Sequence, residues 1–445
     1  MLPIDFVALM EKDLGRENAQ NLFDALNQKP ITSIRLNPEK AQKNPFEGEK
    51  IAWAQDGFYL NERPIFTLEP IFHAGAYYVQ EASSMFLEQA FKQYFNQSVP
   101  LKVLDLCASP GGKSTHLLSL INEDSFLISN ELIKTRVNAL SQNIQKWGRC
   151  NVAVSNNDSE HFKNMPGYFD LVVVDAPCSG EGLFRKDLES RNEWSLNNVK
   201  LCQERQRRIL ANMADSVKEG GFLFYSTCTF NRFENEENIK WACENLAFES
   251  MPISIENKLE IVESQDEAGV LGYHFFPGKT KGEGFFMACL RKTTGSYSKS
   301  SASKINQSKI KFDVDNFVQL QKNLVFIDFQ ESVLMMNESL AAELNFIKSN
   351  LYLKSAGTDL GTVIKNQLNP SAALAYSIIL TNDVKSIDLD KEDALAFLRK
   401  GNFSLPSNTP LGWVLVKHQG LGLGWVKNMG NRFNNYFPMD WRIRM

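Results

Sequence analysis

"DLCASPGGKSTHLL", Asp105 to Leu118, places a Gly-Gly turn between a short apolar run and an amphipathic stretch. Such a turn between a parallel strand and a helix lets backbone N–H groups approach a ligand closely. From Leu101 onward, short apolar runs alternate with helical stretches. The expected strands are "LKVLDLC", "SFLISNE", "NVAVSN", "FDLVVVDA" and "GGFLFYSTC". This alternation predicts an α/β fold with a parallel, doubly wound sheet.

The segment before this alternation predicts a domain of a different kind. Residues 1–98 show helical spacing in "PIDFVALMEKDLGRENAQNLFDAL" and "VQEASSMFLEQAFKQYF", and a strand at "ITSIRLNP". We therefore expect a mixed α+β N-terminal domain. The α/β domain is expected over residues 99–292, where "GYHFFPG" and "GFFMACLRK" predict an antiparallel hairpin at the edge of the sheet.

The composition changes abruptly after residue 292. The stretch "TTGSYSKSSASKINQSK" is rich in Ser and Lys and has no period, which predicts a linker over residues 293–309. Two smaller units are expected beyond it. They are a small α/β domain over residues 310–380 and a C-terminal domain over residues 381–445.

Composition excludes several classes of protein. The chain has 445 residues, 43% hydrophobic, and a net charge of −4. No apolar run approaches the roughly 18 residues of a membrane span, and acids stand where a signal peptide is cationic. The seven cysteines form no C-x-x-C pair, which argues against a zinc knuckle or a disulfide framework. We expect a reduced, cytoplasmic protein that binds no metal and works as a monomer.

The Gly-Gly turn fits two kinds of nucleotide site. A phosphate-binding P-loop has the pattern G-x-x-x-x-G-K-[ST]. Gly112, Lys113 and Ser114 fit its end, but Cys107 stands at its first position. The alternative is a nucleoside site, which needs acids at the ends of successive strands instead.

Carboxylates do follow three of the expected strands. Glu131 comes after "FLISN", Asp158 after "NVAVSNN" and Asp175 after "FDLVVV". Ligands of open α/β sheets bind beyond the carboxyl ends of the strands, and Glu131 stands about where a dinucleotide fold has its ribose-binding acid. One such residue alone is usually a solvated loop acid. Three in register favour a nucleoside with ribose hydroxyls and an amine, and they would repel a triphosphate.

Two cysteines follow two of the expected strands. Cys178 comes after "FDLVVVDAP" and Cys228 after "GGFLFYST". If these strands are parallel neighbours, about 4.8 Å apart, both thiols project into one pocket beside the nucleoside. A free cysteine is usually a buried structural thiol, and that interpretation serves for Cys150, Cys202, Cys243 and Cys289. Strand ends are exposed and functional in this architecture, so the functional interpretation is favoured for the pair.

A nucleoside-bearing cofactor together with a thiol suits methylation of cytosine at C5. That carbon is a poor nucleophile, but a thiolate that adds at C6 makes the ring an enamine whose C5 attacks an activated methyl group. A carboxyl group at N3, where Asp175 could reach, would stabilise the developing charge. The residues alone leave open which cysteine attacks and which assists release.

Three motifs resemble a known family. "DLCASPGGKS", "DAPCSGEG" and "YSTCTFNRFENE" are similar to the signatures of the NOL1/NOP2/Sun RNA cytosine-C5 methyltransferases, although Ser109 stands where the family often has alanine. "SIRLNP", "HAGAYYVQEASSM", "LNPSAALAY", "GWVLVKHQGLGLGWVKNMGNRFNNYFP" and "WRIRM" extend the resemblance over nearly the whole chain, with a tail similar to the PUA-like domain of a bacterial member.

The resemblance implies a fold, a cofactor and a substrate. The fold is a Rossmann-like class I methyltransferase sheet with a C-terminal PUA-like RNA-binding domain, and the cofactor is S-adenosylmethionine. The expected reaction is C5 methylation of a specific cytidine in the decoding region of 16S rRNA. Small-subunit rRNA is the expected partner, free or within the assembled 30S subunit.

The resemblance also assigns roles to individual residues. This family attacks with the cysteine of its Thr-Cys motif, here Cys228, and Cys178 of the Pro-Cys motif helps release the product. DNA cytosine methyltransferases instead attack from a Pro-Cys motif. Asp175 and Lys113 are implied to lie close to the reacting base. Cofactor contacts are implied for Cys107, Ala108, Ser109, Pro110, Gly111, Gly112, Lys113, Glu131, Asp158 and Asp175.

The basic, aromatic tail is typical of a surface that stacks on splayed bases and contacts phosphates. Its candidate residues are Trp425, Lys427, Arg432, Phe433 and Tyr436. RNA contact stays open for the helix charges Arg185, Lys186, Arg205, Arg207 and Arg208. Two alternatives also stay open: a non-catalytic RNA-binding or ribosome-assembly protein on the same fold, and tRNA as the substrate. The intact cysteines and cofactor acids favour an enzyme.

Overall fold

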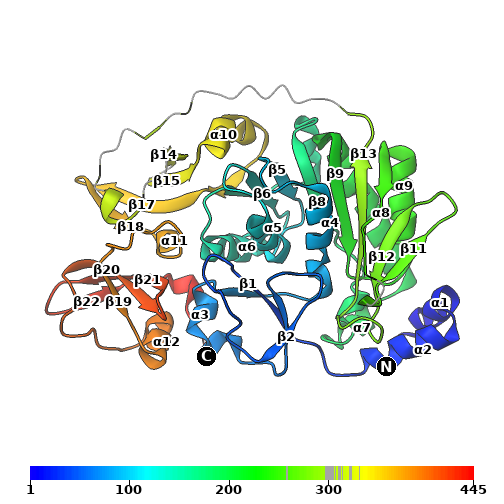
Figure 1. The fold of residues 1–445 in the computed structure, drawn as a ribbon, viewed down its shortest axis with the longest axis horizontal. Coiled ribbons are helices and arrows are strands. Elements are labelled where there is room, and N and C mark those ends of the chain that lie inside the picture. The colour runs from blue at the N-terminus through cyan, green and yellow to red at the C-terminus, as the bar shows by residue number, and fades with distance from the viewer. Residues whose placement is uncertain are drawn as a thin grey trace.

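The computed structural model describes residues 1–256, 259–295, 305, 307–308, 312, 314–319, 323–329 and 331–444. Within these ranges a 10-stranded sheet runs through the middle of the molecule, and three 4-stranded sheets lie around it (Figure 1). Most of the linker expected over residues 293–309 lies outside the described residues. Three of the sheets fall within the expected units, but the large sheet also includes β16 (Leu353–Ala356) from the unit expected over residues 310–380.

Five parallel strands form the centre of the large sheet, in the order β7-β6-β5-β8-β9. All five strands expected from the alternating pattern are confirmed. They are β5 (Lys102–Asp105), β6 (Phe126–Asn130), β7 (Val152–Ser155), β8 (Phe169–Asp175) and β9 (Val217–Thr227). The strand order reverses between β5 and β8, and open α/β sheets bind their ligands at such a switch point.

Antiparallel strands extend the large sheet at both edges. The expected hairpin is confirmed as the pair of β12 (Leu271–Phe275) and β13 (Phe285–Lys292), and β13 also pairs with β9. The hairpin is not the outermost part of the sheet, because β11 (Val262–Gln265) pairs beyond it with β12. On the same side of the sheet, β10 (Phe248–Met251) also pairs with β13. At the opposite edge β16 (Leu353–Ala356) pairs with β7.

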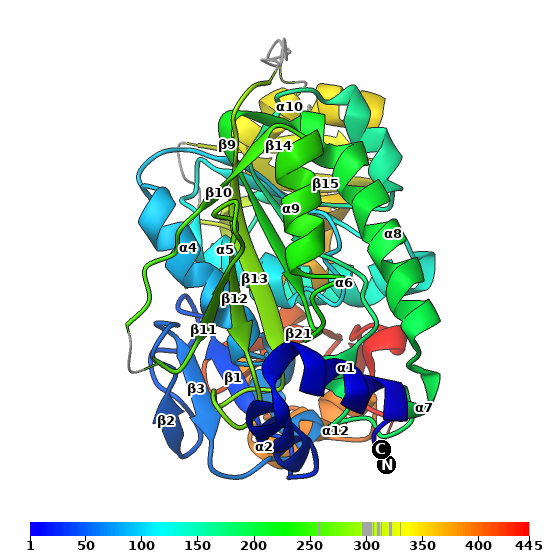
Figure 2. The ribbon, with the colours of Figure 1, turned by 90° about the vertical axis from the view of Figure 1, so that its right-hand side faces the viewer.

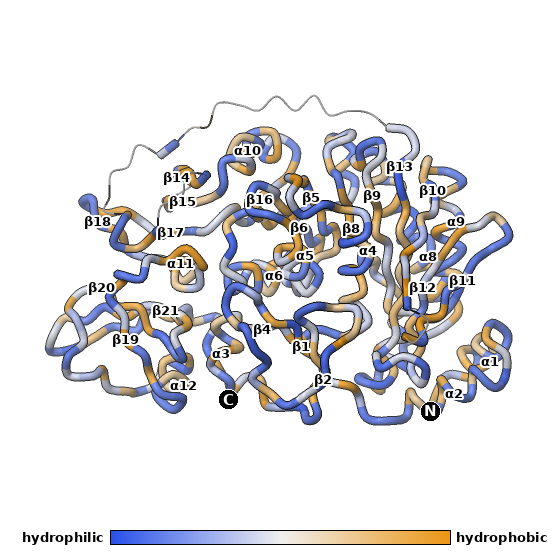
Figure 3. Tube along the Cα trace, viewed as in Figure 1, coloured by the Kyte–Doolittle hydropathy of each residue, from blue (hydrophilic) through white to orange (hydrophobic). Residues whose placement is uncertain are grey.

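Helices cover both faces of the sheet, because alternate strand residues point to opposite sides. Leu104 faces a core with α8, α9 and α10, whereas Val103 faces a core with α4, α5 and α6. Figure 2 shows α4 on one side of the strands and α8 and α9 on the other. These helices are α4 (Leu87–Tyr94), α5 (Gly112–Leu120), α6 (Lys134–Trp147), α8 (Leu196–Met213), α9 (Glu236–Asn245) and α10 (Glu338–Asn350). The apolar residues of the central strands are plain in Figure 3.

The first 98 residues form two separate parts. The expected helical segment is two helices, α1 (Ile4–Leu14) and α2 (Arg16–Leu26). They pack against Phe184 and Phe230, which lie much later in the sequence. The second part is a sheet in the order β2-β3-β1-β4, and the helix expected from Val79 is shorter, since Val79 ends β4. This sheet comprises β1 (Ser33–Leu36), β2 (Gly48–Lys50), β3 (Gly57–Leu60) and β4 (Tyr77–Val79), with α3 (Pro70–His73) before β4.

One buried arginine attaches this small sheet to the α/β domain. Arg35 on β1 is 1% exposed and donates from Nε to Gln80 Oε1 at 2.8 Å. Its Nη2 donates to Thr115 Oγ1 on α5 at 2.7 Å, and its guanidinium lies 4.5 Å from the ring centroid of Trp147 on α6. The N-terminal sheet is therefore held directly over the helices that flank the Gly-Gly turn.

Two further 4-stranded sheets lie after the linker. The first is β14-β15-β17-β18, and the second is β19-β20-β21-β22. Their strands are β14 (Leu324–Phe329), β15 (Ser332–Asn337), β17 (Thr358–Ile364), β18 (Gln367–Pro370), β19 (Ser386–Asp388), β20 (Gly412–His418), β21 (Leu421–Asn428) and β22 (Phe433–Asn435). The short helices are α7 (Ser190–Glu193), α11 (Ala372–Ala375) and α12 (Lys391–Arg399).

The expected boundary between residues 380 and 381 is crossed by a shared core. Trp425 on β21 is 1% exposed and packs with Leu374, Val333 and Leu415, and its Nε1 donates to Ser371 O at 2.8 Å. The sequence interpretation of Trp425 as a base-stacking residue is therefore wrong. Its ring lies on the inner face of β21, where it joins the two C-terminal sheets.

We expect Trp425→Ala to lower the free energy of unfolding by about 3–5 kcal/mol, the usual cost of truncating a buried Trp. Trp413→Ala is the matched control, because Trp413 pairs with Lys427 across the same two strands but is partly exposed. Chemical denaturation followed by circular dichroism measures both variants. Equal losses for the two would contradict the role of Trp425 as a core residue.

Candidate active site

A cavity of about 350 Å³ lies at the carboxyl ends of β5 and β8, where the strand order reverses. The turn after β5, the end of β8 and the turn after β9 line one side, and the segments after β4 and before β13 line the other. The residues that line the cavity include Tyr78, Val79, Cys107, Pro110, Lys113, Asp175, Gly182 and Cys228. The sequence-predicted turn, one strand-end acid and one strand-end cysteine thus meet in one cavity.

The turn after β5 is shaped for close backbone approach. Gly111 has φ +114°, a left-handed conformation that L side chains rarely adopt, and α5 begins at Gly112. Arg136 on α6 holds the turn from the side, since its Nη2 donates to Ser109 O at 2.8 Å while Ser109 Oγ donates to Arg136 O at 3.1 Å. The residues from Cys107 to Lys113 therefore form a fixed backbone cradle at the cavity.

Asp105 lies beneath this cradle and was missed by the sequence analysis. It is fully buried, and Ser114 Oγ donates to its Oδ2 at 2.6 Å. Its Oδ1 has no hydrogen-bond partner among the described residues. Burial raises the pKa of Asp105 from 3.8 to about 7, and the neighbouring Lys113 opposes this rise. The only sequence signal for this residue was an acid at the end of an otherwise apolar strand.

Asp175 ends β8 and forms an ion pair inside the cavity. Lys113 Nζ lies 2.8 Å from Asp175 Oδ2, and Ser226 Oγ donates to Asp175 Oδ1 at 2.8 Å. Lys113 also lies 5.0 Å from the ring centroid of Phe285. A carboxylate held at both oxygens is presented to the cavity in one orientation. The structure thus brings together two of the residues expected near the reacting base.

The two strand-end cysteines are in contact. The expected parallel pairing of β8 and β9 is confirmed, with Asp175 opposite Ser226. Beyond this register, Cys178 Sγ and Cys228 Sγ lie 3.1 Å apart. Cys228 lines the cavity, whereas Cys178 is not among its lining residues. The hydrogen bond with Cys228 and burial raise the pKa of the Cys178 thiol well above its usual value, so Cys178 keeps its proton.

Glu181 is a buried carboxylate that holds the loop after Cys228. Its Oε2 accepts from the backbone N of Phe230 at 2.6 Å and of Asn231 at 3.1 Å. Trp194 Nε1 donates to its Oε1 at 3.0 Å. Burial raises the pKa of Glu181 to about 7. A residue from the Cys178 motif therefore shapes the loop that follows Cys228.

Glu234 makes the reciprocal connection. Its Oε2 accepts from the backbone N of Ser179 at 3.0 Å, and Ser179 Oγ donates to its Oε1 at 2.5 Å. Between the two loops, Gly182 N donates to Cys228 O at 2.7 Å, and a Cβ at Gly182 would lie 2.9 Å from that oxygen. Glu181 and Glu234 lie within the quoted motifs, but their spacing alone did not reveal this crossed arrangement.

Glu131 and Asp158 lie after β6 and β7, as expected, but they are not among the residues that line the cavity. Glu131 Oε1 accepts from Ile133 N at 2.8 Å, and Asp158 Oδ1 accepts from Glu160 N at 2.9 Å. The backbone hydrogen bond from Glu160 lowers the pKa of Asp158. Both acids thus lie at the ends of neighbouring strands.

Arg185 differs from the exposed helix charge that its sequence context suggested. It is buried, and its Nε donates to Glu283 Oε2 at 2.7 Å while its Nη2 donates to Gly282 O at 2.5 Å. Arg185 therefore holds the segment before β13 against the cavity. Lys186, Arg205 and Arg208 are exposed, and Arg207 is half-buried and lies over Trp241.

No group of three or more His, Cys, Asp or Glu side chains that could hold a metal ion is found in the part of the chain that the structure describes. Across the same residues, no helix is both long and apolar enough to cross a membrane. The groups that the cavity and its surroundings offer are two thiols, an ion pair, strand-end acids and a backbone cradle. This donor set suits a nucleoside with a charged amino-acid end, because carboxylates and N–H groups can bind its hydroxyls, amine and carboxylate.

Known proteins share this arrangement of domains. Residues 95–291 match the family described as 16S rRNA methyltransferase RsmB/F. Residues 2–82 match the N-terminal domain of 16S rRNA methyltransferase RsmF, and residues 384–443 match the methyltransferase RsmF PUA domain. Ribosomal RNA small subunit methyltransferase F of Vibrio atlanticus is 30% identical, with 99% of this chain and 97% of that protein covered. The chain belongs to this methyltransferase F family.

Further relatives agree with this membership. Methyltransferase F of Shewanella loihica is 28% identical, with 98% of this chain and 94% of that protein covered. A methyltransferase homolog protein from Pyrococcus horikoshii shares the fold with a TM-score of 0.54 at 27% identity, over 64% of this chain and 94% of that one. NSun6 from Pyrococcus horikoshii, solved with SFG, has a TM-score of 0.55 at 19% identity, over 66% of this chain and 98% of that one.

Membership of the methyltransferase F family confirms the expected class I methyltransferase fold with a PUA-like domain. It makes the protein an S-adenosylmethionine-dependent methyltransferase, so the expected enzyme class and cofactor are confirmed as well. The family therefore favours the nucleoside-site interpretation of the Gly-Gly turn over the P-loop interpretation. The cradle after β5 and the acids after β6, β7 and β8 offer the groups that such a cofactor requires.

Burial of Asp105 predicts a specific dependence of stability on pH. Its pKa is raised in the folded protein, so the folded state binds this proton more tightly than the unfolded chain. The stability that Asp105 contributes is therefore present below about pH 4 and lost as the pH rises to about 7. We expect Asp105→Asn to flatten the pH dependence of stability. The melting temperature of the variant minus that of wild type should therefore be larger at pH 8 than at pH 5.

Thermal unfolding at both pH values measures this difference. Asp187→Asn is the matched control, because it removes the same charge from an exposed position. A difference between Asp105→Asn and wild type that stays constant from pH 5 to pH 8 would contradict the argument.

Proposed function

We propose that this methyltransferase modifies C5 of a specific cytidine in the decoding region of 16S rRNA, through a covalent bond between Cys228 and C6. The contact of the two thiols beside the Asp175–Lys113 ion pair is the observation that carries the proposal. S-adenosylmethionine supplies an activated methyl group. Its proposed contacts are Cys107, Ala108, Ser109, Pro110, Gly111, Gly112, Lys113, Glu131, Asp158 and Asp175.

Cys228 is proposed as the nucleophile. It lines the cavity, and Cys178 lies behind it as a protonated thiol that can donate a hydrogen bond to a Cys228 thiolate. Attack of the thiolate Sγ on C6 forms the S–C6 bond and leaves an enamine at C5. S-adenosylmethionine held at the cradle would supply the methyl group to C5, with the electron pair of the broken S–CH3 bond left on its sulfur.

Asp175 and Lys113 are proposed to position the base during the attack. Lys113 and Ser226 hold one oxygen each of the Asp175 carboxylate, and this fixes its direction. Attack at C6 makes N3 basic, so Asp175 would act there as a protonated carboxyl group that gives its proton to N3, and the Lys113 ammonium would balance the carboxylate that remains. The proposed role of Asp175 and Lys113 is complete once the attack has converted the ring into an enamine.

Cys178 is proposed to act in release. A base removes the C5 proton, the electron pair of that bond expels Sγ from C6, and the Cys228 thiolate is restored. Cys178, 3.1 Å from the departing sulfur, stabilises it by hydrogen bonding.

The C-terminal domain is proposed to bind RNA. Tyr436 is 47% exposed and packs edge-on against Trp413 with ring centroids 4.5 Å apart, and Lys427 lies 5.1 Å from the Trp413 centroid. Such a cationic aromatic surface suits base stacking. Arg432 and Phe433 belong to the same end of the sheet. A ribosomal substrate agrees with the expected cytoplasmic location and with RNA as the partner.

Methyl transfer tests the proposed substrate and position. Purified enzyme with labelled S-adenosylmethionine is offered naked 16S rRNA, 30S subunits, tRNA and DNA. We expect 5-methylcytosine in small-subunit rRNA, with the nucleotide located by bisulfite sequencing and mass spectrometry. Comparison of naked RNA with 30S subunits identifies the preferred form. Methylation at N4, or of tRNA or DNA alone, would refute the proposal.

A pair of variants distinguishes the proposed roles of Cys178 and Cys228. We expect Cys228→Ala to abolish methyl transfer and to form no covalent RNA adduct, because the proposed attacking sulfur is removed. Cys178→Ala should attack and methylate but accumulate a protein–RNA conjugate, because release lacks its hydrogen-bond donor. A denaturing gel reads both results. A stable adduct with Cys228→Ala and none with Cys178→Ala would reverse the assignment.

A further inference from the structure

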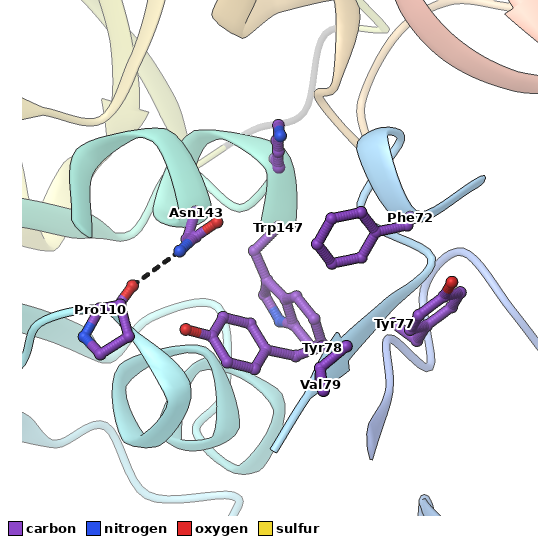
Figure 4. A pocket seen from close by; sticks show the side chains of 9 residues that line it. Phe72, Tyr77, Tyr78, Val79, Pro110, Asn143 and Trp147 are labelled. Carbon is purple, nitrogen blue, oxygen red and sulfur yellow. Dashed lines mark hydrogen bonds between the residues drawn. The ribbon is translucent and has the colours of Figure 1, made fainter. Parts of the chain in front are cut away.

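A second cavity, of about 240 Å³, lies next to the first and shares Tyr78, Val79 and Pro110 with it. We call it the aromatic cavity. It lies between α3, β4 and α6, at the junction of the N-terminal sheet and the α/β domain (Figure 4). Its remaining lining residues are Phe72, Gly75, Tyr77, Asn143, Lys146 and Trp147. The two cavities therefore adjoin each other along these three residues.

Aromatic rings from three elements form most of its wall. Tyr77 and Trp147 are 2% and 1% exposed, whereas Phe72 and Tyr78 are partly exposed. Figure 4 shows Tyr78 between Phe72 and Pro110, with Asn143 bonded to Pro110 at the opposite rim. That bond runs from Asn143 Nδ2 to Pro110 O at 2.8 Å. The cavity thus offers ring faces on one side and an amide on the other.

Lys146 adds a buried positive charge. It is 8% exposed, and in the described ranges no carboxylate lies within ion-pair distance of its Nζ. The ring centroids of Phe72 and Trp441 lie 5.9 Å from this amine. Burial lowers the pKa of Lys146 to about 8, so the amine is still mostly protonated near neutral pH. A buried ammonium without a counter-ion is costly, and an anion that enters the cavity removes this cost.

The cofactor is not the occupant that these groups favour. Of the acids expected to hold it, Glu131 follows β6 just before α6 begins, and Asp158 follows β7. Trp147 ends α6, thirteen residues after Lys134, which corresponds to roughly 20 Å along the helix axis. The aromatic cavity also lacks carboxylates among its lining residues. A ligand with a flat ring and negative charge fits it better than the cationic cofactor.

We infer that the aromatic cavity binds the base of one nucleotide that flanks the target cytidine, and that Lys146 pairs with the adjoining phosphate. This inference rests on the proposed function, since it requires RNA in the neighbouring cavity. Aromatic faces bind bases of any sequence by stacking, and lysine provides the charge for a phosphate. The cavity is smaller than the roughly 300–1,000 Å³ of drug-sized ligand sites, which suits a single base.

Two variants test the two halves of the site. Phe72→Leu keeps an apolar side chain but removes a ring face, and we expect KM for RNA to rise at least fivefold. Lys146→Met removes the charge, and the slope of log affinity against log salt should fall by about one. For both, kcat and the Kd for S-adenosylmethionine should stay near wild type. Lys348→Met on α10 is the matched control, since Lys348 also lies over a ring, that of Phe329.

The identity of the bound nucleotide is tested with RNA fragments that carry one abasic site at each position beside the methylated cytidine. We expect one abasic position to weaken binding to wild type but not to Phe72→Leu. Suppose that wild type methylates rRNA, but that each abasic site weakens binding to wild type and to Phe72→Leu by the same factor. The inference is then wrong, and the proposed function stands. A raised KM for S-adenosylmethionine in Lys146→Met would assign the cavity to the cofactor and also refute it. Absence of methylation by wild type would refute the proposed function itself.

Discussion

The parallel pairing of β8 with β9 is the constraint on which the active site depends. Its register sets Asp175 opposite Ser226, so the side chains that follow both strands leave the sheet at the same level. Cys178 and Cys228 then meet at 3.1 Å, and Ser226 is placed to hold Asp175. A slip of one residue would turn the alternating side chains to the other face and separate the thiols from the cavity.

Buried carboxylates then fix the two loops that carry the thiols. Glu181, from the loop after Cys178, binds the backbone after Cys228, while Glu234 binds the backbone of Ser179. Each carboxylate is satisfied by several donors, which is what makes its burial tolerable. Neither loop can move alone, because each one holds hydrogen-bond acceptors that the other needs. The short distance between the thiols is therefore a property of the pair of loops rather than of either strand.

Much of this site could be predicted from the sequence, because its parts come directly after apolar strands. The five central strands, the Gly-Gly turn and the neighbouring cysteines all follow from local pattern. What the sequence could not reveal depends on long-range contact. The pairing of β16 with β7, across about 200 residues of chain, leaves no local trace. Likewise, Trp425 lies on a strand with basic neighbours, and only the packing of a second sheet shows that its ring points inward.

Arg35 is another buried charged group that holds two parts of the molecule together, here the N-terminal sheet and the α/β domain. Its guanidinium is fully desolvated, which lowers its pKa to about 9 and leaves it charged at neutral pH. It bonds to Thr115 on α5 and lies flat on Trp147 of α6, so one cation holds both helices under the N-terminal sheet. That sheet supplies Tyr78, which lines both cavities. Because the cradle and both cavities share this attachment, a shift of the sheet would change the proposed cofactor, target and flanking-base contacts together. The N-terminal domain, expected from the sequence as a separate mixed α+β unit, thus forms one wall of the candidate active site.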